Sequence, residues 1–465
     1  MKAPLRYALL TCSLLVSACV VGPDYHPPAQ AVPVRWQAKT APSAATDMAK
    51  WWTVFNDDVL SGLMARVQNS NLDLRQAQAR LKEARARRGL AGANLLPTIT
   101  GKSGASQSGS SEQAGSGQTS EFFSHKIDAR WELDIFGKLR RGIEAADANL
   151  QASEEDLRDI LVSLYAETAL NYVEIRSFQA RLAITEFNLN AQAETYQLTQ
   201  WRYQAGLTTQ LDVDQSQLNL ESTRATLPQL HSGLEQAQNR LAVLLGVLPG
   251  TLNAVLNPKR DIPTPPLSIA VGVPADLLRR RPDIRRAERK LAAQTAQIGV
   301  ATAARYPNFT LSGSIGLEAL AYTNLYTASA KAFQIAANSA LTLFDAGRLR
   351  KNVEIQSALQ EQALALYEAT VLQAMRDVEN ALVAMAQEQD RRDTLLKAAA
   401  AATSALNLAQ SQYSAGTSDF FRVLDAQRSL LSVQNQLALS HAEVASNLIR
   451  LYKALGGGWT ANPPS

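Results

Sequence analysis

The chain has 465 residues, a formal net charge of +4 and 19% charged residues. Two of its basic residues lie in a leader that we expect to be removed, so the mature chain is close to neutral. This balance, without any basic cluster interleaved with aromatic residues, excludes nucleic-acid binding driven by bulk charge.

The first residues have the layout of a secretory signal. Lys2 and Arg6 precede a short, largely apolar run, and small residues lead up to Cys19. We therefore predict a signal peptide at residues 1–18 and a lipidated Cys19, as in bacterial lipoproteins. The alternative is an ordinary signal peptidase site with an incidental cysteine. Because the other cysteine lies in the leader, acylation leaves no thiol for disulfides or metal binding.

A proline-rich arm follows, from residue 19 to residue 59. Its prolines indicate extended chain, and Trp51 and Trp52 near its end are expected to dock it on the body. From Leu60 to Leu95 the apolar spacing and the abundance of Ala, Leu, Gln and Arg predict a helix. No later segment reaches the roughly 18 uninterrupted apolar residues of a transmembrane helix, so a membrane crossing would use strands.

Landmarks along the chain recur at a constant offset of 210 residues. The pairs are Asp73 and Asp283, Pro97 and Pro307, Leu133 and Leu343, Gly137 and Gly347, Gly206 and Gly416, and Gly246 and Gly456. This pattern predicts two copies of one unit, at residues 60–246 and 273–456. A proline-rich linker at 247–272 joins them, and a tail at 457–465 follows. Each copy is expected to contain a helix, two strands, a long helix and a return helix.

The strand candidates alternate in polarity. In the first copy they flank a Gly-, Ser- and Gln-rich loop from Ser103 to Ser120, and Lys126 to Ile135 alternates charged with apolar residues. In the second copy, residues 309–318 alternate likewise, and a partner strand is expected from Phe333 to Phe344.

An apolar face opposite a polar face, at bilayer length, fits the wall of a membrane barrel. A soluble amphipathic sheet alternates in the same way, but the lipoprotein-like start favours the barrel. Two strands in each copy are too few for a closed membrane barrel, which needs about eight. Several subunits must therefore share one barrel. Aromatic residues available for its interfaces with water are Trp131, Tyr306, Tyr322, Tyr326 and Phe344.

Two unusually long helices are predicted. No Gly or Pro occurs between Gly142 and Gly206 or between Gly347 and Gly416, and at 1.5 Å per residue each run could reach roughly 90 to 100 Å. Their Ala, Gln, Leu and Glu residues allow close sideways packing without a thick apolar core. A filamentous coiled coil would explain these helices equally well, but not the strands.

The two long runs end in similar bends around Gly206 and Gly416. Past the second bend, Phe421, Asp425 and Arg428 are spaced i, i+4 and i+7, which places them on one helical face. In a ring of subunits this face would form stacked apolar, acidic and basic rings, by which pores constrict. An exposed Asp/Arg pair beside a helix seam is the simpler interpretation. The equivalent residues of the first copy are the uncharged Leu211, Gln215 and Leu218.

No catalytic constellation is apparent. The histidines are scattered, and the sequence has no P-loop, no dinucleotide-binding glycine motif and no His-Glu-x-x-His. We therefore expect neither an enzyme nor a bound cofactor or metal.

These features resemble the TolC-like outer-membrane efflux proteins, most closely their lipoprotein branch of the OprM and NodT type. The resemblance covers nearly the whole mature chain. Its motifs are the lipid box, V-G-P-D-Y after Cys19, W-W-T-V-F-N-D from Trp51, D-L-L-R-R-R-P-D-I-R-R-A-E from Asp276, Y-S-A-G-T from Tyr413 and V-L-D-A-Q-R from Val423.

The resemblance implies an α+β membrane protein with the TolC-like fold. Each chain of a homotrimer would give four strands to a shared 12-stranded β-barrel in the outer membrane and helices to a long periplasmic α-helical barrel. The implied function is the outer-membrane channel of a tripartite efflux system. This channel is a passive duct that exports substrates from an inner-membrane pump, commonly of the resistance-nodulation-division type, through a periplasmic adaptor (membrane fusion) protein. The alternative is a lipid-anchored structural coiled coil without a pore.

The resemblance also implies roles for residues at the bends. Phe421, Asp425 and Arg428 match the rings that close the periplasmic end of such channels. The positions that match adaptor contacts are Gly206, Thr208, Gly416 and Thr417, although helix-bend geometry alone also explains the glycines.

Overall fold

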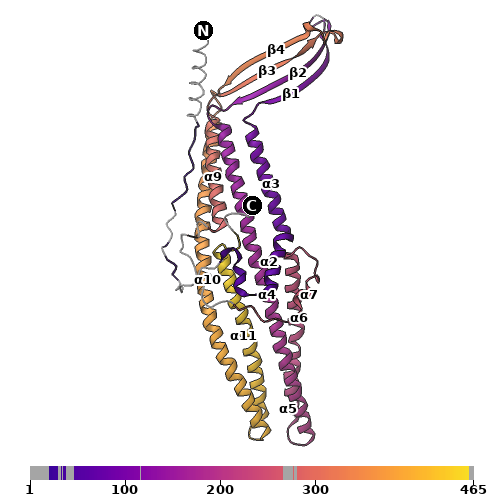
Figure 1. Cartoon of the computed structure of the whole chain (residues 1–465), viewed down its shortest axis with the longest axis vertical. Coiled ribbons are helices and arrows are strands. Elements are labelled where there is room, and N and C mark those ends of the chain that lie inside the picture. The colour runs from indigo at the N-terminus through magenta and orange to yellow at the C-terminus, as the bar shows by residue number, and fades with distance from the viewer. Residues whose placement is uncertain are drawn as a thin grey trace. The chain divides into compact units, whose positions relative to one another are not determined.

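The computed structural model describes residues 20–29, 33, 35–37, 47–115, 117–264, 276 and 280–459. The chain divides into two compact units, each built from three stretches of sequence (Figure 1). Unit 1 contains the described residues of 1–30, 79–154 and 285–369, and unit 2 contains those of 31–78, 155–284 and 370–465. The predicted signal peptide (1–18) and lipidation site (Cys19) lie outside the described residues. So do residues 265–272 of the predicted linker and 460–465 of the predicted tail.

Unit 1 contains a four-stranded antiparallel sheet in which neighbours in sequence are neighbours in space (Figure 1). Its strands are β1 (Thr98–Gly109), β2 (Thr119–Leu133), β3 (Asn308–Ala319) and β4 (Lys331–Ala340), and the short 3-10 turns η3 (Tyr322–Asn324) and η4 (Ala328–Ala330) join the last two. The two copies of the repeat meet where β2 pairs with β3. β1 and β4 are edge strands, so closing this sheet into a barrel requires strands from other copies of the chain.

The strand boundaries correct part of the sequence analysis, which predicts a loop from Ser103 to Ser120. β1 continues to Gly109 and β2 begins at Thr119, because the two strands pair without interruption along their length. Backbone hydrogen bonds to the neighbouring strand hold this polar segment, so its lack of apolar residues is no obstacle to a strand. The predicted end of the last strand at Phe344 is also too late, since β4 ends at Ala340.

Four helices contribute residues to both units. They are α3 (Leu72–Ala93) and α4 (Lys138–Gln204), which flank the first strand pair, and α9 (Pro282–Ala303) and α10 (Arg348–Ser414), which flank the second. α4 and α10 each run for 67 residues, as the long stretches without Gly and Pro predict. None of the helices in the described part of the chain contains an apolar stretch of the length that a bilayer crossing requires.

Two helices that the sequence analysis predicts as continuous are broken. The helix predicted from Leu60 to Leu95 divides into α2 (Asp58–Ser70) and α3, because Asn71 is extended and its side chain accepts from the Leu74 N–H at 2.8 Å. The return helix of the first copy divides into α5 (Gln210–Arg224) and α6 (Thr226–Leu244), where Pro228 lies in the first turn of α6. The return helix of the second copy, α11 (Phe420–Ala454), has no proline and runs unbroken.

The main hydrophobic core of unit 2 is centred on Trp51. This side chain comes from the 3-10 helix η2 (Met48–Phe55), is fully buried and stacks on the Tyr452 ring at a centroid distance of 5.3 Å. Trp52 packs on Tyr165 with their rings 4.7 Å apart. Leu256, from the short helix α7 (Asn253–Leu256), enters the same core. The two tryptophans therefore dock the end of the arm on unit 2, as predicted.

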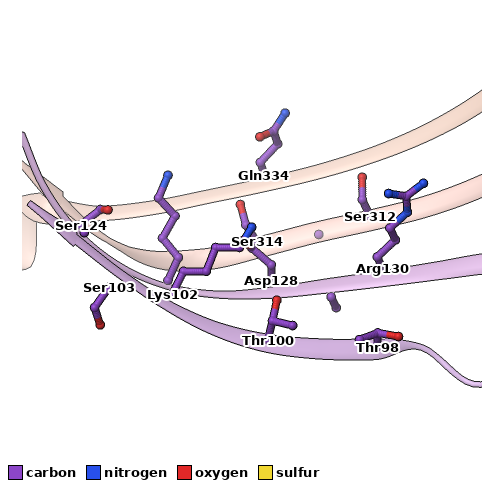
Figure 2. A pocket seen from close by; sticks show the side chains of 14 residues that line it. Thr98, Thr100, Lys102, Ser103, Ser124, Asp128, Arg130, Ser312, Ser314 and Gln334 are labelled. Atoms are coloured by element: carbon purple, nitrogen blue, oxygen red, sulfur yellow. The ribbon is translucent and has the colours of Figure 1, made fainter. Parts of the chain in front are cut away.

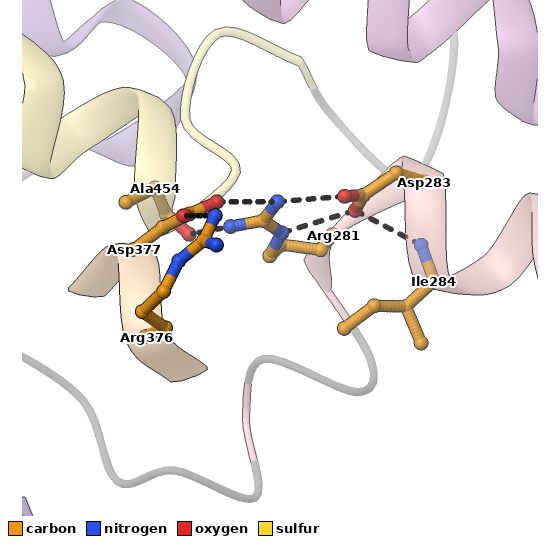
Figure 3. A network of polar contacts seen from close by, with 6 residues as sticks. All are labelled: Arg281, Asp283, Ile284, Arg376, Asp377 and Ala454. Carbon is orange, nitrogen blue, oxygen red and sulfur yellow. Dashed lines mark hydrogen bonds and ion pairs between the residues drawn. The ribbon is translucent and has the colours of Figure 1, made fainter. Parts of the chain in front are cut away.

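In each copy of the repeat, a side chain near the start of the copy donates a hydrogen bond to a backbone carbonyl at the end of its last helix. In the first copy, Asn71 Nδ2 donates to the Leu244 carbonyl of α6 at 2.8 Å. In the second copy, the residue 210 positions later is Arg281, and its Nη1 donates to the Ala454 carbonyl of α11 at 3.0 Å (Figure 3). The two acceptors are also 210 residues apart. The two copies therefore share this contact between their first and last helices. The donor is a neutral amide in the first copy and a guanidinium in the second.

Arg281 also joins two acidic side chains in unit 2. Its Nη2 and Nε donate to the two carboxylate oxygens of Asp283 at 2.6 and 3.0 Å, and Asp377 Oδ2 lies 3.5 Å from Nη2 (Figure 3). Asp283 in turn accepts from the Ile284 N–H at 2.9 Å, which caps the start of α9. Burial opposes the charge of Arg281, but hydrogen bonding and attraction to Asp283 outweigh it, so the net effect raises the pKa of the guanidinium.

The first described residues after Cys19, up to Asp24, contact helices of unit 1 and the chain just after β2. Val21 N–H donates to the Phe136 carbonyl at 3.2 Å, and Arg141 Nη2 donates to Asp24 Oδ1 at 2.7 Å. The hydrogen bond from Arg141 lowers the pKa of the Asp24 carboxyl. Gly22 has φ +97°, and a Cβ there would lie 2.4 Å from the Cα of Gly299 in α9. Only glycine allows this approach, so the arm has one fixed path beside the end of β2.

Candidate functional site

Two helix bends lie at the same end of unit 2, one between α4 and α5 and the other between α10 and α11 (Figure 1). Gly206 and Gly416 occupy the turns, and both have φ +72°. In each bend the N–H after the glycine donates to the carbonyl five residues earlier, at 2.8 and 2.9 Å. A Cβ on either glycine would meet no atom within 4 Å, so the left-handed backbone and not crowding requires glycine.

The two threonines beside these glycines use their hydroxyls differently. Thr208 donates to Asp212 Oδ2 at 2.6 Å, inside a capping box that Thr209 and Asp212 form at the start of α5. Burial raises the pKa of Asp212, but the hydroxyls of Thr208 and Thr209 lower it more. Thr417 is exposed, and it donates back to the Gln412 carbonyl at 3.1 Å. Thr417 therefore belongs to the end of α10, and Thr208 to the beginning of α5.

Phe421, Asp425 and Arg428 share one exposed face of α11, as their spacing predicts. Phe421 is 60% exposed, and the two charged residues are also exposed. Asp425 forms no ion pair within the part of the chain that the structure describes. Arg428 instead donates from Nε to Asn219 Oδ1 of α5 at 2.9 Å. The simple i, i+3 ion pair is therefore not present, and the arginine connects the two helix pairs.

Further contacts between the two helix pairs follow the same side of α11. Gln427 Nε2 donates to Thr195 Oγ1 of α4 at 2.9 Å, and Asn188 Nδ2 donates to Gln434 Oε1 at the same distance. These partners are neutral, so they can separate and regain water without exposing an unpaired charge. Near the bends, the guanidinium of Arg202 lies 4.4 Å from the centre of the Tyr413 ring. None of these contacts is predicted from the sequence.

One face of the sheet in unit 1 is polar along its length. Figure 2 shows Lys102, Arg130, Ser314 and Gln334 projecting to one side of the sheet, and Ser103 to the other. A hollow of about 790 Å³ lies over the polar side. Lys102 Nζ is 2.8 Å from Asp128 Oδ2. This alternation agrees with the predicted division into a polar and an apolar face.

Comparison with known proteins identifies relatives over almost the whole chain. Residues 63–247 and 273–457 match the family model of outer membrane efflux proteins. Nodulation protein T of Rhizobium leguminosarum bv. trifolii is 34% identical over 461 residues, covering 98% of this chain and 97% of the relative. The pyoverdine export outer membrane protein OpmQ of Pseudomonas putida is 33% identical, and the alignment covers 100% of both chains.

A solved structure of the outer-membrane channel OprN has a similar fold. It superposes with a TM-score of 0.89 at 36% sequence identity, covering 95% of this chain and 100% of the channel.

Proposed function

The chain belongs to the outer membrane efflux protein family, and from this membership we propose that its second bend closes the channel while both bends receive a periplasmic adaptor. The protein is the outer-membrane channel component of a tripartite efflux system, and it works as a trimer with the helical barrel in the periplasm. Members of the family are channels and not enzymes. The alternative of a structural coiled coil without a pore is not favoured, because the sheet would have no role in it.

The single observation that carries the proposed gate is the difference between two otherwise equivalent bends. Both expose an apolar side chain at the same position, 62% of Leu211 and 60% of Phe421. Only the second copy adds charge, with Asp425 one turn further and Arg428 two turns further along α11. Three copies of this face around an axis would narrow the duct and place acidic and basic rings in it. We propose Phe421, Asp425 and Arg428 as the periplasmic gate.

For adaptor docking we propose the exposed backbone of the two bends, with Gly206, Thr208, Gly416 and Thr417 as contact positions. The glycines cannot test docking, since any substitution there strains the left-handed turn. Thr417 can, because it is exposed and a substitution keeps the bond from its backbone N–H to the Gln412 carbonyl, losing only the bond from its hydroxyl.

Replacing Thr417 by arginine should abolish or strongly reduce export in cells while the purified trimer keeps its conductance in planar bilayers. A large charged side chain obstructs a packed interface, but it leaves the bend intact. Thr417→Ser, which keeps the hydroxyl, is the matched control and should export normally. Full export by the arginine variant would place the adaptor elsewhere, and altered conductance would show that the residue acts on the channel itself.

We also propose that acylated Cys19 anchors the chain in the outer membrane. The arm that follows is held by Val21 and Asp24 in unit 1, so the anchor begins only a few residues from the sheet. Cys19→Ser should abolish incorporation of labelled fatty acid, and trimers should still form because the strands supply the membrane contact. Labelling that persists in the serine variant would refute the assignment.

The lumen offers little basis for selecting cargo by charge. The polar face of the four strands carries the basic residues Lys102, Lys126 and Arg130 and the acidic residues Asp128, Glu132 and Glu318, which balance. We propose that an inner-membrane pump, of the resistance-nodulation-division type, chooses the substrate. We further propose the domain organisation given by the repeats, with an arm at 19–59, copies at 60–246 and 273–456, a linker at 247–272 and a tail at 457–465.

A further inference from the structure

The face of the sheet opposite the polar one carries the odd-numbered residues of all four strands. Its large apolar side chains are strongly exposed in the single chain, including Ile315 at 66%, Phe333 at 81% and Ile335 at 79%. Since the polar face lines the duct, this face meets the lipid of the outer membrane.

Two basic residues interrupt this face, and both lie in the same row across the sheet. Ser103 is paired with His125, His125 with Leu317, and Leu317 with Lys331. No other Lys, Arg or His lies on this face of the described strands. The face has one acidic residue, Glu121, four residues nearer the strand ends that join β1 and β2. Lys331 is exposed and forms no ion pair with any described residue.

The row reaches the loop end of two strands, because Leu317 is two residues before the end of β3 and Lys331 begins β4, whereas β1 and β2 extend six residues beyond it. β1 follows α3 and β2 leads into α4, so the β1–β2 and β3–β4 loops are at the opposite end of the strands (Figure 1). Because the helical barrel is periplasmic, this is the outer-leaflet end. A lysine facing lipid costs about 2–4 kcal/mol at the middle of a bilayer but only about 0–1 kcal/mol near its surface. Lys331 begins β4 at this end, where the cost of a lipid-facing lysine is smallest, so we place it at the level of the outer-leaflet headgroups.

The surroundings of the row suit both parts of a lipid. His125 Nδ1 is 2.7 Å from Ser103 Oγ, which leaves Nε2 as its second polar atom, and the Tyr326 ring centre is 5.9 Å from the His125 ring. The residues of the row also line a hollow of about 650 Å³, together with apolar residues such as Ile127, Ile315 and Phe333. The Lys331 ammonium group and the His125 ring nitrogen suit a lipid phosphate, and the apolar hollow beside them suits an acyl chain.

We propose that Lys331 and His125 bind the phosphate of a phosphorylated glycolipid of the outer leaflet, with one of its acyl chains in the hollow beside them. The proposal rests on the proposed function only for the placement of this face in the outer membrane. Each trimer has three such sites, one on every chain. Lys331 supplies the charge complementarity and His125 a ring nitrogen for a hydrogen bond, and a lipid without phosphate lacks the group that they recognise.

The test titrates purified trimers in detergent with lipid A, a bisphosphorylated diglucosamine lipid, and follows their thermal unfolding. Lipid A should raise the unfolding temperature, whereas dephosphorylated lipid A and inorganic phosphate should not. Lys331→Gln and His125→Gln should each raise the lipid concentration that gives half of the stabilisation by about tenfold. The matched control is Arg130→Gln, a basic residue of β2 on the polar face that does not line the hollow (Figure 2), and it should respond like the unaltered protein.

Two outcomes would overturn the proposal. One is an equal stabilisation by dephosphorylated lipid A, and the other is an unchanged response of the Lys331 variant. A response to inorganic phosphate alone would likewise show that the site recognises a free anion and not a lipid. Conductance of the same variants in planar bilayers keeps this test separate from the channel function, because none of the three substitutions alters the bends.

Discussion

Replacing Arg281 by alanine should destabilise the folded protein by about 1.5–3 kcal/mol, the contribution typical of hydrogen bonds to charged groups. The side chain is only 12% exposed, and it bonds both Asp283 and the last turn of α11. Its loss leaves the partly buried Asp283 carboxylate without its charged partner and the Ala454 carbonyl without the donor from Arg281 (Figure 3). Thermal unfolding of purified trimers measures the effect, and low recovery of trimer from membranes is expected as well.

Two variants separate the network from ordinary surface charge. Arg376→Ala removes a neighbouring arginine that pairs with the same Asp377, but its side chain is 63% exposed, so we expect a change of about 0–1 kcal/mol. Asn71→Ala removes the equivalent hydrogen bond of the first copy, from a neutral amide to the Leu244 carbonyl. We expect this substitution to lower the free energy of unfolding by about 1–2 kcal/mol. Equal effects of the Arg281 and Arg376 substitutions would mean that the contacts of Arg281 contribute no more to stability than a surface ion pair.

The contacts of Asn71 with Leu244 and of Arg281 with Ala454 show what a repeat in the sequence can predict. The constant offset of 210 residues places Asn71 opposite Arg281 and Leu244 opposite Ala454 without any structure. What it cannot show is that the two pairs make the same contact, because an amide and a guanidinium share no sequence signal. The two bends could be predicted in the same way, because the glycines that form their turns recur at the same offset.

The polar segments were harder to predict because their partners are distant. From Ser103 to Gly109 the side chains indicate a loop, yet pairing with β2 makes a strand, and this information lies in the neighbour. The contacts of α11 pose the same difficulty. Asn219 and Thr195 bind residues 209 and 232 positions away, and nothing in their own surroundings distinguishes them from other polar helix residues. Such partners follow from the fold, not from a local pattern.

Replacing Asp425 and Arg428 together by alanine should raise the single-channel conductance of reconstituted trimers several times. In the trimer that we propose, both rings and the bond from Arg428 to Asn219 disappear at once, so the second helix pair loses charge in the duct and a polar link to the first. Because these groups are exposed, their attraction is screened by salt, and the difference from the unaltered protein should shrink in concentrated electrolyte.

The duplicated bend supplies a matched control for this experiment. Gln215→Ala together with Leu218→Ala alters the equivalent positions of the first copy, which carry no charge, and should leave the conductance low. Asn219→Ala removes the acceptor of the bond from Arg428 and the donor of a 3.4 Å bond to Gln427 Oε1, and it leaves both charges in place. An intermediate conductance is expected if these links between the helix pairs help to hold the gate closed. If the Asp425 and Arg428 double variant forms intact trimers whose conductance is unchanged, these two residues do not close the channel. The constriction would then have to lie with the apolar side chains that both bends expose, Leu211 and Phe421.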